Sequence, residues 1–402
     1  MSEMWARVRE RVFVGAGSIA ITVMLAGPAQ SYTFKVLHQF TGFPNDGAYA
    51  SGGVIRDSAG NLYGTTQVGG TYWCGGSPDP GCGTIFKISP DGTETILHSF
   101  GAFGDGVVPS ASLTLDDTGN LYGTAGGGAH SCGIVFKIAP DRTETVLYSF
   151  AGGSDGCEPS SGVSLDASGN LYGTTLSGGN DRCKKFNGDG CGTVYKIAPD
   201  GTETEIYAFS GKRRGWHPDF GVVVDKRGVI YGTAETGKND SWNGFVFKIF
   251  PNGGMHIIHK FAGYPADGAV PSSALVLDKA GNIFGTTSIG GSANFGSLFK
   301  IAPDGSESLL YSFQNGTDGE NPHTLIENRN GDFFGLAGDN YGPVWRLSRN
   351  GDENALYTFN NNDWAPEGNI VLDKTGTIYG TLAVGGPGCD DIGCGAVYSL
   401  TR

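Results

Sequence analysis

Residues 60–66 read Gly-Asn-Leu-Tyr-Gly-Thr-Thr, and the Tyr-Gly-Thr part of this stretch returns along the chain at intervals of 45 to 59 residues. The seven copies, in this or a closely similar form, are Tyr63-Gly64-Thr65, Tyr122-Gly123-Thr124, Tyr172-Gly173-Thr174, Tyr231-Gly232-Thr233, Phe284-Gly285-Thr286, Phe334-Gly335-Leu336 and Tyr379-Gly380-Thr381. Repeats of this length are typical of propeller blades and are too long for ankyrin or tetratricopeptide units.

Each copy contains four short runs of β-branched and aromatic residues separated by turn residues. In the second copy these runs are Ser112–Asp116, Asn120–Thr124, Gly133–Ile138 and Thr143–Phe150. Four strands per repeat indicate a propeller blade, and we name them A to D from the inside outward. The absence of a 10-residue helical periodicity between the runs argues against a helical solenoid or a parallel βαβ sheet. The sequence therefore predicts an all-β, seven-bladed β-propeller.

The two ends of the repeat region predict how the ring closes. A D-type run, Thr33–Phe40, precedes every A strand, and the last repeat stops after its C strand, Ala396–Leu400. We expect the N-terminal run to supply the missing outer strand of the last blade, which hides the free sheet edges.

The N-terminal segment has the pattern of a secretory signal peptide. Arg7, Arg9 and Arg11 precede an apolar stretch, residues 12–25, which is followed by small residues around Ala29 and Ser31. We expect residues 1–31 to be removed and residues 32–402 to form a single propeller domain. A membrane anchor is the alternative, but the stretch is shorter than the roughly 20 residues a span needs. The mature chain has no other apolar segment long enough, so we expect an exported protein, periplasmic or extracellular, without a membrane span.

The formal net charge of −13 makes nucleic acid and anionic membrane surfaces poor partners, because both carry negative charge. The 69 glycines lie at fixed positions between β-type residues, where they mark turns rather than disorder.

The repeat resembles the GloVer tandem repeat, named from Gloeobacter and Verrucomicrobia proteins. The elements that carry the resemblance are GNLYGTT at residues 60–66, GTIFKI at 83–88, PDGTET at 90–95 and LHSF at 97–100. The resemblance covers almost the whole mature chain and implies an exported or surface protein, but it implies no catalytic residue. Family members often carry a C-terminal sorting segment, and because the chain ends at Arg402 without one we do not expect a covalent surface anchor.

The acidic residues of the repeat are interpreted as turn residues. Before each A to B turn stand Asp57, Asp116, Asp166, Asp225, Asp278, Asn328 and Asp373, and before the A strands stand the Asp-Gly pairs beginning at Asp46, Asp105, Asp155, Asp267 and Asp318. Asp and Asn at turns hydrogen-bond their own backbone and need no ion, so we predict neither a metal nor a cofactor. The aromatic residue of Tyr-Gly-Thr is expected to pack between blades, with the glycine allowing close backbone approach.

Eight cysteines fall almost entirely in the B to C loops. Their positions predict disulfides between Cys74 and Cys82, Cys183 and Cys191, and Cys389 and Cys394. Cys132 and Cys157 lie in a B to C loop and the following D to A loop, which should emerge on one face, and are predicted to pair. Zinc binding is the alternative, but there is no Cys-x-x-Cys pair.

Departures from the repeat gather in the same two kinds of loop. Trp73, Trp216, Trp242 and Trp364 lie there, whereas Trp345 lies in a strand. Exposed aromatic rings suit sugar rings or a protein partner; the alternative is that they cover small loop cores. Arg213 and Arg214, with Lys212 and with Arg182, Lys184 and Lys185, predict a basic patch for an acidic polysaccharide, unless they are solvated loop charges.

Four polar residues near the start of A strands, His217, Asp219, His323 and Glu367, are weak candidates for a catalytic acid and base. No motif links them. The preferred interpretation is a monomeric, non-catalytic binding module for a polysaccharide or a surface protein. The alternative is a secreted hydrolase or lyase acting on a polysaccharide or lactone at the channel mouth.

Overall fold

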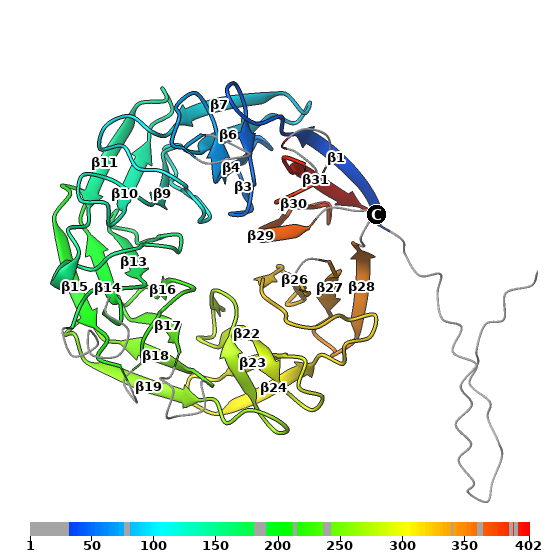
Figure 1. Ribbon diagram of the computed structural model, residues 1–402. Coiled ribbons are helices and arrows are strands. Elements are labelled where there is room, and N and C mark those ends of the chain that lie inside the picture. Colours follow the sequence, from blue (N-terminus) through cyan, green and yellow to red (C-terminus); the bar gives the residue numbers. More distant parts are fainter. Residues whose placement is uncertain are drawn as a thin grey trace, which may run out of the picture. The chain divides into compact units, whose positions relative to one another are not determined.

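The computed structural model describes residues 32–75, 81–180, 190–211, 215–235, 243–338, 341–359, 365–385, 389 and 393–402. In these ranges the chain forms strands, turns and one short 3-10 helix, η1 (Gly153–Asp155). The strands form seven blades around a ring, as the repeat predicted (Figure 1). No helix in the described ranges is long and apolar enough to cross a membrane.

The blades follow the order of the chain, each from its inner strand outward. Blade 1 contains β3 (Val54–Arg56), β4 (Leu62–Thr66), β6 (Thr84–Ile88) and β7 (Glu94–Ser99), and blade 2 contains β8 (Thr114–Leu115), β9 (Leu121–Ala125), β10 (Ile134–Ile138) and β11 (Glu144–Ser149). Blade 3 contains β12 (Ser164–Leu165), β13 (Leu171–Thr175), β14 (Thr193–Ile197) and β15 (Glu203–Ala208), and blade 4 contains β16 (Val222–Val224), β17 (Ile230–Ala234), β18 (Phe245–Ile249) and β19 (Met255–Lys260).

The other blades vary this plan slightly. Blade 5 contains β21 (Val276–Leu277), β22 (Ile283–Gly290), β23 (Ser297–Ile301) and β24 (Glu307–Ser312), with β20 (Gly268–Pro271) paired to the end of β22. Blade 6 contains β25 (Ile326–Glu327), β26 (Phe333–Leu336), β27 (Pro343–Leu347) and β28 (Glu353–Thr358). Blade 7 contains β29 (Pro366–Leu372), β30 (Ile378–Leu382), β31 (Ala396–Thr401) and β1 (Thr33–Gln39), and β2 (Gly47–Ala48) pairs with β5 (Val68–Gly69) outside the blades.

The ring is closed by the first strand, as the sequence predicted. β1 runs antiparallel to β31, from the pair Thr33–Thr401 to the pair Gln39–Ala396. In Figure 1 the blue β1 lies beside the red β31. The outer edge of the last blade is therefore covered by residues at the other end of the sequence.

The interior of each blade is built on a glycine covered by an aromatic ring. A Cβ on Gly64 would lie 2.5 Å from the ring of Phe86 and 2.8 Å from the carbonyl oxygen of Gly53. The glycine therefore leaves room for an aromatic side chain as well as for the neighbouring backbone. The sequence had predicted only the close approach of the backbone. The seven rings, all buried, belong to Phe86, Phe136, Tyr195, Phe247, Phe299, Trp345 and Tyr398.

These rings also join the blades to one another. Phe40, which follows β1 in blade 7, packs edge-on against Phe86 of blade 1, with ring centroids 5.0 Å apart. The same contact recurs at the six other joints, for example between Phe313 and Trp345. Edge-to-face aromatic pairs contribute beyond the area they bury, by about 0.5–1.5 kcal/mol each.

A β-bulge interrupts the outer pair of strands in every blade. In blade 1 the register shifts between Ile85 and Phe86, so that Leu97 of β7 is skipped and His98 pairs with Ile85. A bulge changes the direction in which the following side chains point. The residue after each bulge is a histidine or a tyrosine: His38, His98, Tyr148, Tyr207, His259, Tyr311 and Tyr357.

The acids at the A to B turns hold the turns, as expected. Asp57 accepts hydrogen bonds from the backbone and side-chain nitrogens of Asn61 and from the hydroxyl of Tyr63. Tyr63 meanwhile packs against the core between blades 1 and 2. In the equivalent turn burial opposes ionisation of Asp116, but hydrogen bonds led by that from Asn120 prevail and lower its pKa to about 2.

Candidate functional site

The B to C and D to A loops form one face of the ring, which we call the loop face. Its geometry is fixed by a hydrogen bond that recurs between blades: the backbone N–H of Val108, before blade 2, donates to the carbonyl oxygen of Cys82, before strand C of blade 1. Equivalent bonds join Tyr49 to Cys394, Glu158 to Cys132, His217 to Cys191, Val270 to Asn243 and Asn321 to Phe295. All six donors have a positive φ, between 45° and 62°, which non-glycine residues seldom adopt.

This recurrence changes the interpretation of His217. It precedes β16 by several residues and occupies a backbone position common to six loops, so only its side chain is specific to blade 4. The ring of His217 stacks on that of Trp216, with centroids 4.8 Å apart and planes at 13°. The sequence had been interpreted as departing from the repeat at His217. The structure shows that the backbone at His217 follows the repeat and that only its side chain differs.

Disulfides fasten the loop face. The predicted bonds between Cys74 and Cys82, between Cys132 and Cys157, and between Cys389 and Cys394 are present. Cys191 is also disulfide-bonded, and its predicted partner Cys183 lies outside the described residues. The bond from Cys132 ties the B to C loop of blade 2 to the loop that enters blade 3.

The candidate ligand-binding tryptophans differ in their surroundings. Trp73 is 66% exposed and meets only the edge of Phe43 among the ring contacts of the described residues. Trp216 is half-buried, packs against the cluster that contains Phe245, and donates from its indole nitrogen to Glu235 over 3.3 Å. It therefore serves in part as a loop core. Trp242, Trp364, Arg213 and Arg214 lie outside the described residues, as do Lys212, Arg182, Lys184 and Lys185.

Exposed apolar side chains concentrate on the loop face. Nine large hydrophobic side chains are exposed in the described ranges, and all but Ile257 of β19 lie in, or at the entrance of, a B to C or D to A loop. The eight are Tyr72, Trp73, Phe103, Val108, Phe220, Tyr264, Ile289 and Tyr341. Sequence reasoning considered the tryptophans and missed the others. Two of them, Phe103 and Tyr264, share a position shortly before an Asp-Gly pair, which the half-buried Phe43 also occupies.

The four weak catalytic candidates fall into two groups. His323 and Glu367 line one cavity of about 580 Å³, together with Ser288, Ile289, Asn321, Gly338 and Gly368, from blades 5, 6 and 7. Burial raises the pKa of Glu367. His217 and Asp219 belong to blade 4 and are not among the residues that line this cavity.

Asp219 has unusual surroundings of its own. One of its carboxylate oxygens is buried and, within the described residues, has no hydrogen-bond partner. Burial, followed by repulsion from Glu235, raises the pKa of Asp219 to about 7. A carboxylic acid with that pKa can exchange a proton near neutral pH.

A second cavity opens at the other end of the channel. It holds about 1500 Å³ and is lined by the inner strands of blades 2 to 5 and by turn residues that include Lys226, Arg227 and Lys279. Arg227 is paired with Asp225 at 3.0 Å. Residues from both kinds of turn at the ends of the strands opposite the loop face contribute, so this cavity and the loop face are separate surfaces.

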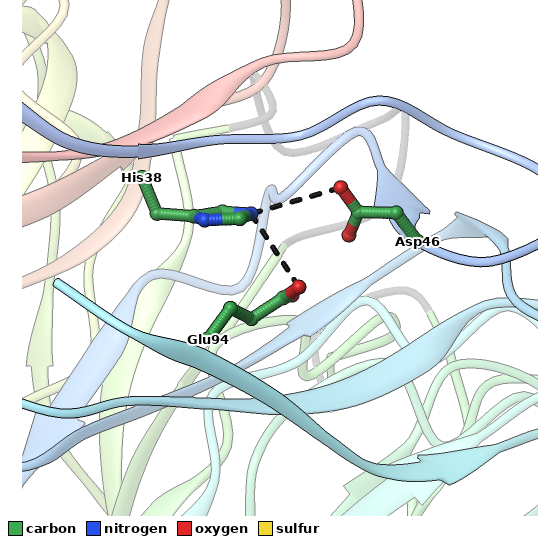
Figure 2. A group of neighbouring side chains, drawn as sticks. All are labelled: His38, Asp46 and Glu94. Atoms are coloured by element: carbon green, nitrogen blue, oxygen red, sulfur yellow. Dashed lines mark ion pairs between the residues drawn. The ribbon is translucent and has the colours of Figure 1, made fainter.

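At the blade joints the structure gathers polar groups that sequence reasoning did not connect. At five of the seven joints the histidine or tyrosine after the bulge lies beside the aspartate of the next Asp-Gly pair, and a glutamate from the following blade completes the group. His98 bonds Asp105 at 3.0 Å, Tyr148 bonds Asp155 at 2.7 Å, His259 bonds Asp267 at 3.1 Å and Tyr311 bonds Asp318 at 3.0 Å. At the joint of blades 7 and 1 the group is His38, Asp46 and Glu94 (Figure 2).

Solved structures with a similar fold include the extracellular domains of two B. thetaiotaomicron proteins. One is the extracellular domain of a protein described as a one component system (16% identity, TM-score 0.53, covering 91% of this chain and 40% of that one). The other is that of a hybrid two component system (13%, 0.54, 92% and 41%). The chain thus spans about two fifths of the length of these domains, and at such identities the likeness concerns the fold alone.

A gluconolactonase of Xanthomonas campestris is a further similar structure, with 12% identity, a TM-score of 0.44 and coverage of 92% of this chain and 90% of that one. No curated protein matches the sequence. The model of the Gloeobacter/Verrucomicrobia repeat matches residues 21–185 and 182–398, which together are most of the chain. The chain therefore belongs to the Gloeobacter/Verrucomicrobia repeat family.

Proposed function

We propose that this protein is an exported, non-catalytic module that binds carbohydrate through the loop face. The observation that carries the proposal is the position of the exposed large apolar side chains, eight of nine of which, in the described ranges, lie on that face. Exposed apolar side chains that gather on one face of a protein favour an interaction site there, whereas those scattered singly over a surface need no explanation.

The type of side chain favours sugars as the ligand. Six of the eight are aromatic residues of the loops, namely Tyr72, Trp73, Phe103, Phe220, Tyr264 and Tyr341. An aromatic ring offers a flat apolar surface that can cover the C–H face of a pyranose, while nearby polar groups bond its hydroxyls. Tyrosine and tryptophan supply both, and they lose little side-chain entropy on binding because each has only two rotatable bonds.

The loops that carry these rings are held in place. Trp73 stands next to Cys74, which is bonded to the buried Cys82. Phe103 lies between Gly101 and Asp105, and the Asp105 carboxylate accepts hydrogen bonds from the backbone N–H groups of Gly101 and Ala102. A preorganised loop pays less ordering entropy on binding, which favours recognition of a rigid ligand.

A glycan array with the purified mature protein tests the proposal, followed by titration of the best ligand. We expect Trp73→Ala or Phe103→Ala to weaken binding by about 1–3 kcal/mol, the scale of an aromatic contact at a binding hot spot. Ile257→Ala is the matched control, because Ile257 is exposed on β19, away from the loop face. If neither Trp73→Ala nor Phe103→Ala weakens binding, the ligand binds elsewhere. The basic patch at Arg213 and Arg214 would then be tested with an acidic polysaccharide.

A hydrolase or lyase remains the second candidate, and the cavity of His323 and Glu367 favours it. The raised pKa of Glu367 would keep more of that group protonated near neutral pH, as a general acid requires. Glu367→Gln should then abolish turnover of a bound polysaccharide or lactone while leaving its binding intact. Unchanged ligand after long incubation with the parent protein excludes this candidate.

Export is the third element of the proposal. It is supported by the signal-like pattern of residues 1–31 and by the disulfides, which persist in oxidising compartments. Fractionation of cells, with N-terminal sequencing of the product, should find a chain that begins near Tyr32 outside the cytoplasm. A cytoplasmic product that retains residues 1–31 would contradict export. Gel filtration tests the expected monomer.

A further inference from the structure

The joint between blades 7 and 1 differs in one respect from the four other joints that contain the aspartate of an Asp-Gly pair. His38 comes from β1, Asp46 from the loop that enters blade 1, and Glu94 from β7 of blade 1 (Figure 2). The Nε2 atom of His38 lies 3.6 Å from Oδ2 of Asp46 and 3.5 Å from Oε2 of Glu94. These separations are too long for hydrogen bonds, whereas four other joints have a bond of 2.7–3.1 Å at this place.

Buried polar atoms at this joint therefore have unused bonding capacity. Nε2 of His38 and Oε1 of Glu94 are buried and, within the described residues, have no hydrogen-bond partner. The His38 nitrogen is the atom that distinguishes this joint, because Oε1 of the glutamate is also buried without a partner at the four other joints, in Glu144, Glu203, Glu307 and Glu353. The three side chains are 19%, 9% and 14% exposed, for His38, Asp46 and Glu94 in turn. A buried polar atom without a partner in a folded protein needs an explanation, such as an ion.

The spacing of the ligand atoms fits a small divalent ion. One ligand atom from each of the three residues lies within 4.8 Å of the others. Around a tetrahedral zinc with bonds of about 2.0–2.2 Å, neighbouring ligand atoms lie about 3.4 Å apart, close to the two distances from His38. Imidazole with two carboxylates is also a donor set that zinc accepts, with water in the fourth position.

The aspartate is already oriented for such a role. Oδ2 of Asp46 accepts hydrogen bonds from the backbone N–H of Thr41 at 2.8 Å and from its hydroxyl at 3.0 Å, and Oδ1 accepts one from the N–H of Gly47. Bonds of this kind hold a ligating carboxylate in position around a metal.

We propose that His38, Asp46 and Glu94 form a zinc site that fastens the ring-closing strand β1 to blade 1. The sequence pattern had assigned Asp46 to turn chemistry and predicted no metal, because aspartates at turns hydrogen-bond their own backbone. It did not connect His38 or Glu94 with Asp46. His259, Asp267 and Glu307 form a second group within the same 4.8 Å limit. There, however, His259 already bonds Asp267, so the tight site is at His38.

The test is a zinc titration of the mature protein after removal of metal with a chelator, by competition with a chromophoric chelator. We expect one tight site per chain and a higher melting temperature with zinc. His38→Tyr should lower the zinc affinity at least about 100-fold and abolish the temperature shift, because it removes the nitrogen ligand. The fold should tolerate it, since tyrosine stands at this position in four joints, where Tyr148 and Tyr311 bond the aspartate.

His98→Tyr is the matched control and should leave zinc binding unchanged. His98 already bonds Asp105, and its joint is not among the groups of described residues whose three ligand atoms lie within 4.8 Å of one another. Glu94→Gln is the second variant and should weaken binding without depending on how tyrosine is accommodated. A parent protein that does not bind zinc overturns the proposal. The proposal is also overturned if His38→Tyr and Glu94→Gln bind zinc as tightly as the parent protein does. It is likewise overturned if His98→Tyr or His259→Tyr loses zinc binding and His38→Tyr does not.

Discussion

The interior of the blades and the loop face follow opposite rules. In the interior the same contact occurs seven times: an aromatic ring covers a glycine and meets a phenylalanine of the preceding blade. On the loop face the backbone hydrogen bond recurs, but the side chain at the donor position changes, for example from Val108 to Glu158 to His217. The difference shows that the repeat fixes the packing of the interior and the backbone of the loops. The side chains that the loops present on the surface vary from blade to blade. Substitutions in the two regions should accordingly separate stability from binding.

The largest expected effect is loss of the ring-closing strand. Deletion of residues 33–40 removes β1 and Phe40, exposes the edge of β31 and leaves the ring of Phe86 without its partner. An exposed edge strand pairs with other chains, so the variant should aggregate or lose its cooperative melting. Melting and light scattering measure this, and a monomeric variant that melts like the parent would show that β1 is not part of the shared interior.

The single substitution Gly64→Ala tests the interior of a blade. The added methyl group would meet the Phe86 ring at 2.5 Å and backbone at 2.8 Å, which should destabilise the fold by about 1–3 kcal/mol through overpacking. Gly254→Ala is the control, because its nearest neighbour is the side chain of Asn252 at 3.3 Å in an exposed turn. Equal denaturation midpoints for the two variants would show that the contact between Gly64 and the Phe86 ring is not as close as the structure has it.

Removal of a disulfide tests whether the loop face is indifferent to stability. Cys132 and Cys157 are 25 residues apart and Cys389 and Cys394 only 5. Chain-entropy arguments give about 3.5 kcal/mol for the longer loop and about 2 kcal/mol for the shorter. Replacing each pair with serine and measuring urea denaturation should reproduce that order. The reverse order would mean that the loops' own packing, rather than loop length, decides.

The joints should make stability depend on pH. Burial, followed in each case by the charge of the neighbouring aspartate, raises the pKa of Glu203 and Glu353 to about 7. A group whose pKa is raised on folding stabilises the fold below its unfolded value of about 4.3, and this contribution is lost as the pH rises through 7. Asp116, with a pKa of about 2, stabilises above its unfolded value of about 3.9 and loses this as the pH falls through 2.

Urea denaturation should therefore give the highest stability near pH 4–5, with a decline towards pH 8. The double variant Glu203→Gln and Glu353→Gln should flatten that decline, because an amide does not titrate. A decline of the same steepness in the variant would show that other groups cause it.

The smallest effect on stability should come from an exposed side chain of the loop face. Trp73→Ala removes a side chain that is 66% exposed, and surface substitutions of this kind stay within about 0.5 kcal/mol. A marked fall in melting temperature would mean that Trp73 belongs to a loop core, as Trp216 partly does, and the comparison between interior and loop face would lose its clearest case.

The fold was predictable because its signal is repeated. Tyr-Gly-Thr at regular intervals gave the number of blades, and the unmatched run at residues 33–40 gave the closure. Cysteine positions likewise predicted three disulfides that are present. The joint groups could not be predicted, because they combine a residue after a bulge, a loop aspartate and a glutamate of the next blade. The bulge leaves no mark in the alternation of the sequence, and without it His38 would be assigned to the wrong side of its strand.

Closure by β1 also decides how the molecule would respond to force. Thr33 and Thr401 face each other at the start of the β1–β31 ladder, so a pull applied between the two ends of the propeller acts on that pair first. The ladder would then open one hydrogen bond after another, as a zipper does, instead of resisting with all its bonds together as in shear. Attachment through a single end would leave the ladder unloaded, so where the chain is tethered sets how much tension the ring withstands.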